Sequence, residues 1–142
     1  MTNLSGVPKW LKKEYIDMLA SEDLWLMLLD ENHTPDLANH RYISHVAINE
    51  VADTIGYNAG GIHITDQSSN FDGNNCYLDL PDISIGPHAT INYRYGALYT
   101  KTGGTGQATY KIRAHIDFLV NKIVLNGTSV IRWNAVGIIY VQ

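Results

Sequence analysis

One stretch of the chain limits its possible folds more than any other, because apolar and polar residues alternate without exception between residues 110 and 118. The even positions are all apolar: Tyr110, Ile112, Ala114, Ile116 and Phe118. The odd positions are all polar: Lys111, Arg113, His115 and Asp117. Side chains of a β-strand point alternately to its two faces. The pattern therefore predicts a strand with one buried and one polar face.

Further strands are predicted around this one. Residues 91–99 carry an apolar or aromatic side chain at every odd position, and the glycine-rich residues 103–106 predict a flexible hairpin tip between the two runs. The dipeptide Asn126-Gly127 tolerates the positive φ angles of a type I′ turn, and so predicts a tight hairpin between residues 122–125 and 129–133. A last strand is expected over residues 136–141.

The N-terminal part of the chain predicts one helix and one buried strand. Residues 1–7 are interpreted as a flexible arm, and Pro8 suits the first turn of a helix over residues 8–20. Helical spacing assigns its apolar side to Leu11, Tyr15, Met18 and Leu19, and its solvent side to Lys12, Lys13 and Asp17. The unbroken apolar run at residues 24–29 predicts a strand that is covered on both faces.

The middle of the chain is less regular. Loops are predicted over residues 32–40, 56–61 and 68–75, the last with a turn at Asp72-Gly73, and a short strand over residues 62–65. Residues 41–54 are consistent with a helical turn that leads into a strand. About eight strands, one short N-terminal helix and hairpin links predict an all-β fold, an antiparallel β-sandwich or barrel-like domain. A single β-rich domain is expected over residues 8–142.

Charge and composition argue against several classes of protein. The formal net charge is -4, from 10 basic and 14 acidic residues, whereas nucleic-acid binding needs a clustered positive surface. No run approaches the ~20 apolar residues of a membrane span, and no secretory signal is expected. Cys76 is the single cysteine, so no intrachain disulfide can form. Nine tyrosines, twelve glycines and only 17% charged residues are typical of extracellular β-sandwiches and virion proteins.

Metal binding is not predicted from the spacing of the six histidines, which are His33, His40, His45, His63, His88 and His115. Only His40 and His45 are close in sequence, no cysteine pair accompanies them, and zinc ligands are usually a few residues apart. His115 and Asp117 are expected on the polar face of one strand. Residues 66–79 are rich in oxygen ligands but lack the pattern of an EF-hand. We therefore expect no metal ligand.

Catalytic and cofactor-binding residues are not predicted either. Glu50 and Asp53 are a candidate carboxylate pair by proximity, but nothing in the sequence marks either as buried. Gly56, Gly60 and Gly61 form no phosphate-binding motif, and no nucleophile elbow occurs. We expect a protein without enzymatic activity, although catalytic groups that converge only in space would leave no such signature.

Several short motifs occur in an order that resembles a known family. They are Thr34-Pro35-Asp36, Asn49-Glu50-Val51, the segment from Gly56 to Gly61, Tyr95-Gly96-Ala97-Leu98-Tyr99, and the segment from Trp133 to Ile138. This order resembles small structural proteins of tailed bacteriophages, including head decoration (cement) proteins, from about residue 10 to the end. The chain departs from the family pattern at Asn58, at residues 52–55 and in the bulky run at residues 24–27.

The resemblance implies a function in a virus particle. A capsid decoration protein would bind the major capsid protein on the capsid exterior, after synthesis in the host cytoplasm. It would be a homo-oligomer, with a trimer favoured, and would bind neither nucleic acid nor membrane. The N-terminal segment would be its grip on the capsid. Alternatives are a tail or adaptor component, or a carbohydrate- or receptor-binding module at the tail whose aromatic side chains stack on sugars. A hydrolase ranks last.

Overall fold

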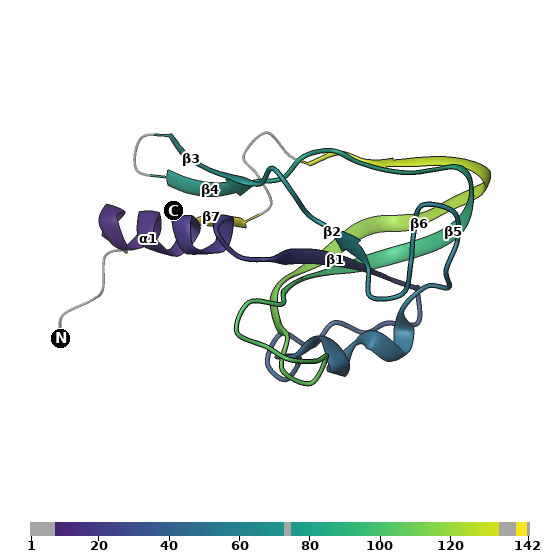
Figure 1. The fold of residues 1–142 in the computed structure, drawn as a ribbon, viewed down its shortest axis with the longest axis horizontal. Coiled ribbons are helices and arrows are strands. Elements are labelled where there is room, and N and C mark those ends of the chain that lie inside the picture. The colour runs from purple at the N-terminus through teal and green to yellow at the C-terminus, as the bar shows by residue number, and fades with distance from the viewer. Residues whose placement is uncertain (1–7, 73–74, 134–138, 142) are drawn as a thin grey trace. The chain divides into compact units, whose positions relative to one another are not determined.

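The computed structural model of the chain describes residues 8–72, 75–133 and 139–141. Contacts divide the chain into two compact units. We call Asp23–Ile64 with Ile83–Ile131 the central unit, and Met1–Glu22, Thr65–Asp82 and Arg132–Gln142 the terminal unit. Figure 1 shows the elements of each. The predicted arm over residues 1–7 lies outside the described residues, and a single domain over residues 8–142 stays a prediction.

The central unit contains a four-stranded antiparallel sheet in the order β2-β1-β5-β6. Its strands are β1 (Leu24–Leu29), β2 (Ile62–His63), β5 (Ile83–Thr100) and β6 (Lys111–Ile131). The predicted hairpin tip at residues 103–106 is confirmed, because it joins the paired strands β5 and β6. Two 3₁₀ helices, η1 (Ile43–His45) and η2 (Ala47–Asn49), occupy the segment where a helical turn was expected.

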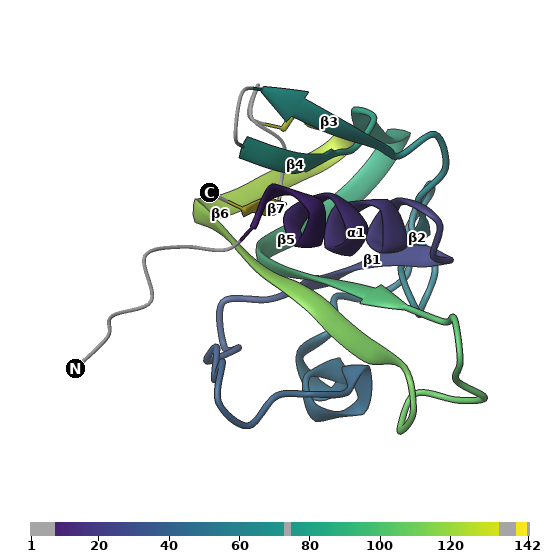
Figure 2. The same ribbon diagram turned by 90° about the vertical axis from the view of Figure 1, so that its left-hand side faces the viewer.

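The core of the central unit lies where residues 43–49 pack against one face of this sheet. Figures 1 and 2 both show this coiled segment beside the strands. The buried residues of this core cluster are Met27, Leu29, Ile43, Val46, Ala97 and Tyr99. Strand β1 is buried on both faces, as its apolar run predicts, since Leu24, Leu26 and Leu28 are also fully buried.

Strand β6 is confirmed, but its single buried face is not. Ile112 pairs with Tyr99 and Ala114 pairs with Leu98, so one extra residue lies in β6 between these pairs. Such a β-bulge reverses the faces on which the following side chains lie. Tyr110 and Ile112 consequently pack against the core cluster, whereas Ile116 and Phe118 lie near Gly96, on the face that also bears the Leu26 side chain. Residues 112–116 are all partly buried.

The hairpin predicted at Asn126-Gly127 is wrong. Strand β6 runs through both residues, and Gly127 pairs with Ala89 of β5. Between the pairs at Gly127 and Val124, β6 contains one residue more than β5, and Asn126 has φ of 49°. The positive φ that the dipeptide tolerates therefore serves a bulge within a long strand rather than a turn between two strands.

The terminal unit contains helix α1 (Lys9–Ala20) and a three-stranded antiparallel sheet in the order β3-β4-β7. Its strands are β3 (Ser68–Asp72), β4 (Asn75–Asp79) and β7 (Ile139–Val141). The loop predicted over residues 68–75 is thus wrong. Strand β3 pairs with β4 along its whole length, from Ser68 with Asp79 to Asp72 with Asn75. The turn predicted at Asp72-Gly73 falls partly outside the described residues, as does the start of the last strand.

Helix α1 is confirmed, but of the four residues predicted on its apolar side only Leu19 is buried. It packs on β3 and β4 and buries Lys12, Ile16 and Leu19, while Leu11, Tyr15 and Met18 are 40–43% exposed. Lys12, which was expected in solvent, is only 7% exposed, because a long lysine stem can cover apolar surface. On the same side, Asp17 accepts a hydrogen bond of 2.7 Å from the hydroxyl of Ser69 in β3.

The fold class predicted from the sequence is confirmed. The described residues are mostly strands in antiparallel sheets, with one short α-helix near the N-terminus. Seven strands are present in this part of the chain, against about eight expected. None of the described helices is long and apolar enough to cross a membrane.

Candidate functional site

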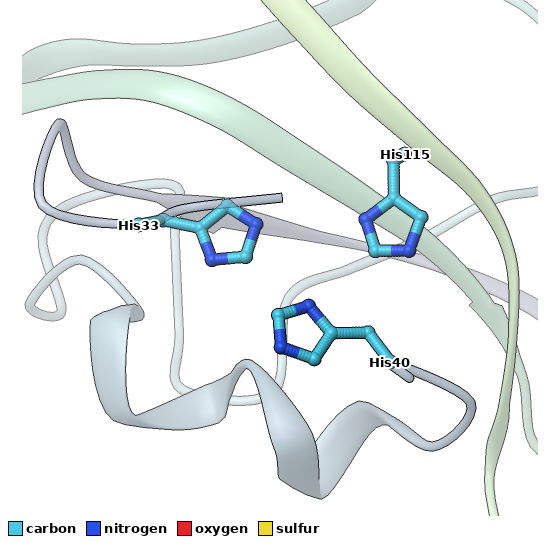
Figure 3. A group of neighbouring side chains, drawn as sticks. All are labelled: His33, His40 and His115. Atoms are coloured by element: carbon cyan, nitrogen blue, oxygen red, sulfur yellow. The ribbon is translucent and has the colours of Figure 1, made fainter. Parts of the chain in front are cut away.

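Three histidines that are far apart in sequence come together in the central unit. His33 and His40 lie in the segment that follows β1, and His115 lies on β6, where it pairs with Ala97. One ring nitrogen from each histidine lies within 4.8 Å of those of the other two. The ring centroids are 5.7 to 6.4 Å apart, and Figure 3 shows the three rings around a common space. We call these residues the His cluster.

Two aspartate turns hold the segment between β1 and η1 in shape. The carbonyl of Asp30 accepts a hydrogen bond from the backbone N–H of His33 at 3.3 Å. The carbonyl of Asp36 accepts one from the backbone N–H of His40 at 2.9 Å. The carboxylate of Asp36 accepts hydrogen bonds from the backbone N–H and from the side-chain amide of Asn39. Aspartate favours such local bonds, which offer the backbone an alternative to helix or strand. Each turn therefore places one histidine of the cluster.

The end of the same segment is fixed to the first residues of β6. The backbone N–H of Ile112 donates to the carbonyl of Arg41 at 2.8 Å, and the N–H of Ile43 donates to the carbonyl of Tyr110 at 2.9 Å. These bonds hold the residue that follows His40 against the strand that bears His115. These backbone hydrogen bonds thus bring His40 close to His115.

Two ring nitrogens of the cluster lack a hydrogen-bond partner in the part of the chain that the structure describes. His33 is 4% exposed, and the other two rings are half-buried. Nδ1 of His40 and Nδ1 of His115 are buried and have no hydrogen-bond partner in the described part of the chain. His45, the neighbour that sequence spacing suggested for His40, differs, because its Nδ1 accepts the backbone N–H groups of Arg41 and Tyr42 at 3.1 and 3.2 Å.

Burial also favours the neutral form of two of these side chains. Desolvation lowers the pKa of His33 and that of His115 below the ordinary value of 6.5, and the charge that His40 would carry lowers both further. For a histidine, a lowered pKa means that the uncharged imidazole predominates at neutral pH. An uncharged imidazole keeps a lone pair that can bind a metal ion.

Two of the remaining histidines have polar partners elsewhere. Nε2 of His63 lies 2.7 Å from Asp23, and Nδ1 of His88 lies 3.1 Å from Asn126. Sequence reasoning did not identify the His cluster, because His115 follows His40 by 75 positions, with strands β2 to β5 between them. Asp117, expected to share a polar face with His115, forms hydrogen bonds with Arg94.

Of the two carboxylates that the sequence suggested as a pair, Glu50 has a structural role in a hydrogen-bond network. Glu50 accepts hydrogen bonds from the hydroxyl of Tyr57 at 2.7 Å and from the N–H of Gly60 at 2.8 Å, whereas Asp53 is exposed. The hydroxyl of Tyr57 in turn accepts the backbone N–H of Leu28 at 2.9 Å, and burial raises the pKa of this tyrosine. Glu50 therefore fastens the glycine-rich loop to β1.

Comparisons with known proteins return no relative: no family model, no curated protein and no solved structure matches the chain.

The second distinctive feature of the central unit is a run of exposed apolar residues in β6. The exposed fractions are 75% for Leu119, 56% for Val120, 62% for Ile123 and 76% for Leu125. Strand β6 is the last strand in the sheet order, and beyond the bridge from Lys111 to Tyr42 its outer edge pairs with no other described strand. We call residues 119–125 the β6 surface.

Proposed function

We propose that this chain is a non-enzymatic structural protein of a tailed-phage virion, a decoration protein that binds the major capsid protein on the outside of the head. The order of its sequence motifs supports the viral part of the proposal. The β6 surface supports the binding part, because its exposed apolar side chains lie on the last strand in the order of the sheet.

An edge strand of this kind is a liability for a free monomer. Unpaired N–H and C=O groups on an exposed edge invite pairing with another chain, and proteins usually protect such edges with charge, proline or short length. The β6 surface instead presents four large apolar side chains, with Lys122 the single charged residue among seven. Burying each large side chain contributes about 1.5–3 kcal/mol. The surface thus fits a partner that covers it.

A symmetric oligomer agrees with a decoration role. Identical subunits on a symmetric lattice bind through the same surface in every copy, and linked copies gain apparent affinity without new contacts. We propose a homotrimer at local three-fold positions of the capsid. The exposed apolar side of α1, formed by Leu11, Tyr15 and Met18, supports a second contact made by the N-terminal segment.

Lysine substitutions on the β6 surface test the proposed contact. The double variant Ile123→Lys, Leu125→Lys should bind capsids stripped of this protein at least ~10-fold more weakly, because two charges would be buried in an apolar interface. Co-sedimentation with the capsids of the encoding phage measures the change. Folding should persist, since both side chains are more than 60% exposed.

A matched control separates this contact from a general effect of added charge. Ile48 is 88% exposed and lies outside the β6 surface, so Ile48→Lys should decorate capsids as the unaltered chain does. Equal decoration by the double variant and the control would exclude the β6 surface as the capsid contact.

A further inference from the structure

The His cluster has the composition of a transition-metal site, since it brings three imidazole side chains together. Its three imidazoles come from two turns and a strand, and they lie around a common space (Figure 3). Buried polar atoms in native proteins nearly always have a partner, and an unsatisfied one requires an explanation. Here two such atoms, on His40 and His115, lie in the same cluster.

The distances suit a small ion. Zinc binds imidazole nitrogens at about 2.0–2.1 Å in tetrahedral geometry, which places two such ligands about 3.4 Å apart. The ring nitrogens of the cluster lie within 4.8 Å of one another, so side-chain rotations that close each gap by about 1.5 Å or less would complete the geometry.

Nearby groups do not compete for this position. The carboxylate of Asp36 is engaged by Asn39, and Nδ1 of His45 by two backbone N–H groups. The donors of the His cluster are therefore purely imidazole. Imidazole suits zinc, copper, nickel and iron, whereas calcium and magnesium prefer oxygen.

We propose that His33, His40 and His115 together bind one divalent transition-metal ion, with Zn²⁺ as the best match. The ion fastens the segment after β1 to β6 and links residues that are 82 positions apart in sequence, His33 and His115. Three protein ligands leave a fourth position for water. This proposal replaces the sequence-based expectation of no metal ligand, and it holds or fails independently of the proposed virion role.

Metal titration of the full chain tests the site. After treatment with a chelator, calorimetric titration with Zn²⁺ should give one ion per chain, and saturating Zn²⁺ should raise the Tm by about 5–10 °C. Co²⁺ in its place should show the intense visible absorption of a four-coordinate ion. A weak six-coordinate spectrum, or the absence of stoichiometric binding, would overturn the proposal.

Ligand variants locate the ion. Each of His33→Gln, His40→Gln and His115→Gln should weaken Zn²⁺ binding by more than about 100-fold, since even residues that only support ligands contribute 10–100-fold. His88→Gln is the matched control and should bind as the unaltered chain does, because His88 lies outside the cluster. Equal binding by all four variants would contradict the site.

A measurement on the unaltered chain tests the site without depending on whether the variants fold. Crystals grown with Zn²⁺ and measured at the zinc absorption edge should show one anomalous peak within about 2.1 Å of a nitrogen from each of the three histidines. A peak at His63 or His88 alone, or an adventitious ion on the surface only, would overturn the assignment.

Discussion

Replacing Gly61 with alanine is expected to destabilise the chain by about 3–5 kcal/mol, the sum of backbone strain and steric overlap. Gly61 has φ of 109°, a conformation that side chains with a Cβ rarely adopt. An added Cβ would also overlap the carbonyl of Leu26, which lies in the strand that pairs with the next residue, Ile62. The change would therefore separate β2 from β1.

Urea denaturation measures this loss, and a second glycine provides its control. Gly106 lies in the hairpin tip between β5 and β6, and a Cβ added there would have no neighbour within 4 Å. Gly106→Ala should change the free energy of unfolding by less than about 0.5 kcal/mol. Similar stabilities for Gly61→Ala and Gly106→Ala would show that the contact between Gly61 and β1 is wrong.

The variant Tyr57→Phe is expected to lose about 2–3 kcal/mol, although it removes a single oxygen atom. That oxygen accepts the buried N–H of Leu28 and donates to Glu50, so both groups lose a partner at once. A missing partner for a buried polar group costs more than the net contribution of one exposed hydrogen bond. Thermal and urea unfolding should both report the loss.

A double-mutant cycle tests whether these contacts act as one network. The cost of Tyr57→Phe should shrink when Glu50→Gln is already present, because the two side chains share a hydrogen bond. Tyr15→Phe is the matched control, since Tyr15 is 40% exposed on α1. Additive losses from Tyr57→Phe and Glu50→Gln would show that the two residues act independently.

The elements with a strong local pattern were predictable from the sequence. Helix α1, strand β1 and the pairing of β5 with β6 follow from apolar spacing and a glycine-rich tip. Their buried faces were less predictable, because one bulge in β6 redirects Ile112 to the face opposite from that of Ile116. Bulges depend on the partner strand, which a single segment does not reveal.

Other local sequence preferences, for turns and for strand ends, were outweighed by strand pairing in the sheet. Asn126-Gly127 favours a tight turn, yet residues on both sides of it pair with β5, and the positive φ of Asn126 is used within the strand. Strand β5 likewise begins at Ile83, ahead of the predicted start at residue 91, although Gly86 and Pro87 usually interrupt strands. Long-range pairing outweighs these preferences of a fraction of a kcal/mol to a few kcal/mol.

The His cluster was beyond sequence reasoning for a different reason. Its members satisfy no short motif, because His115 reaches the other two only through the register of β6 and the backbone bonds that follow His40. The loop over residues 32–40 was predicted from the sequence, but a loop prediction does not reveal which strand the loop faces. Sites assembled from distant segments require the fold before they can be identified.

The most direct test of the proposed function is to look for this chain in purified phage particles, where the proposal places it. Mass spectrometry should detect it as a stoichiometric component, and cryo-electron microscopy should place its antiparallel sheets on the outer surface of the head, with the β6 surface against the major capsid protein. A position at the tail tip would favour the receptor-binding alternative. Absence of the chain from purified particles would contradict the proposal.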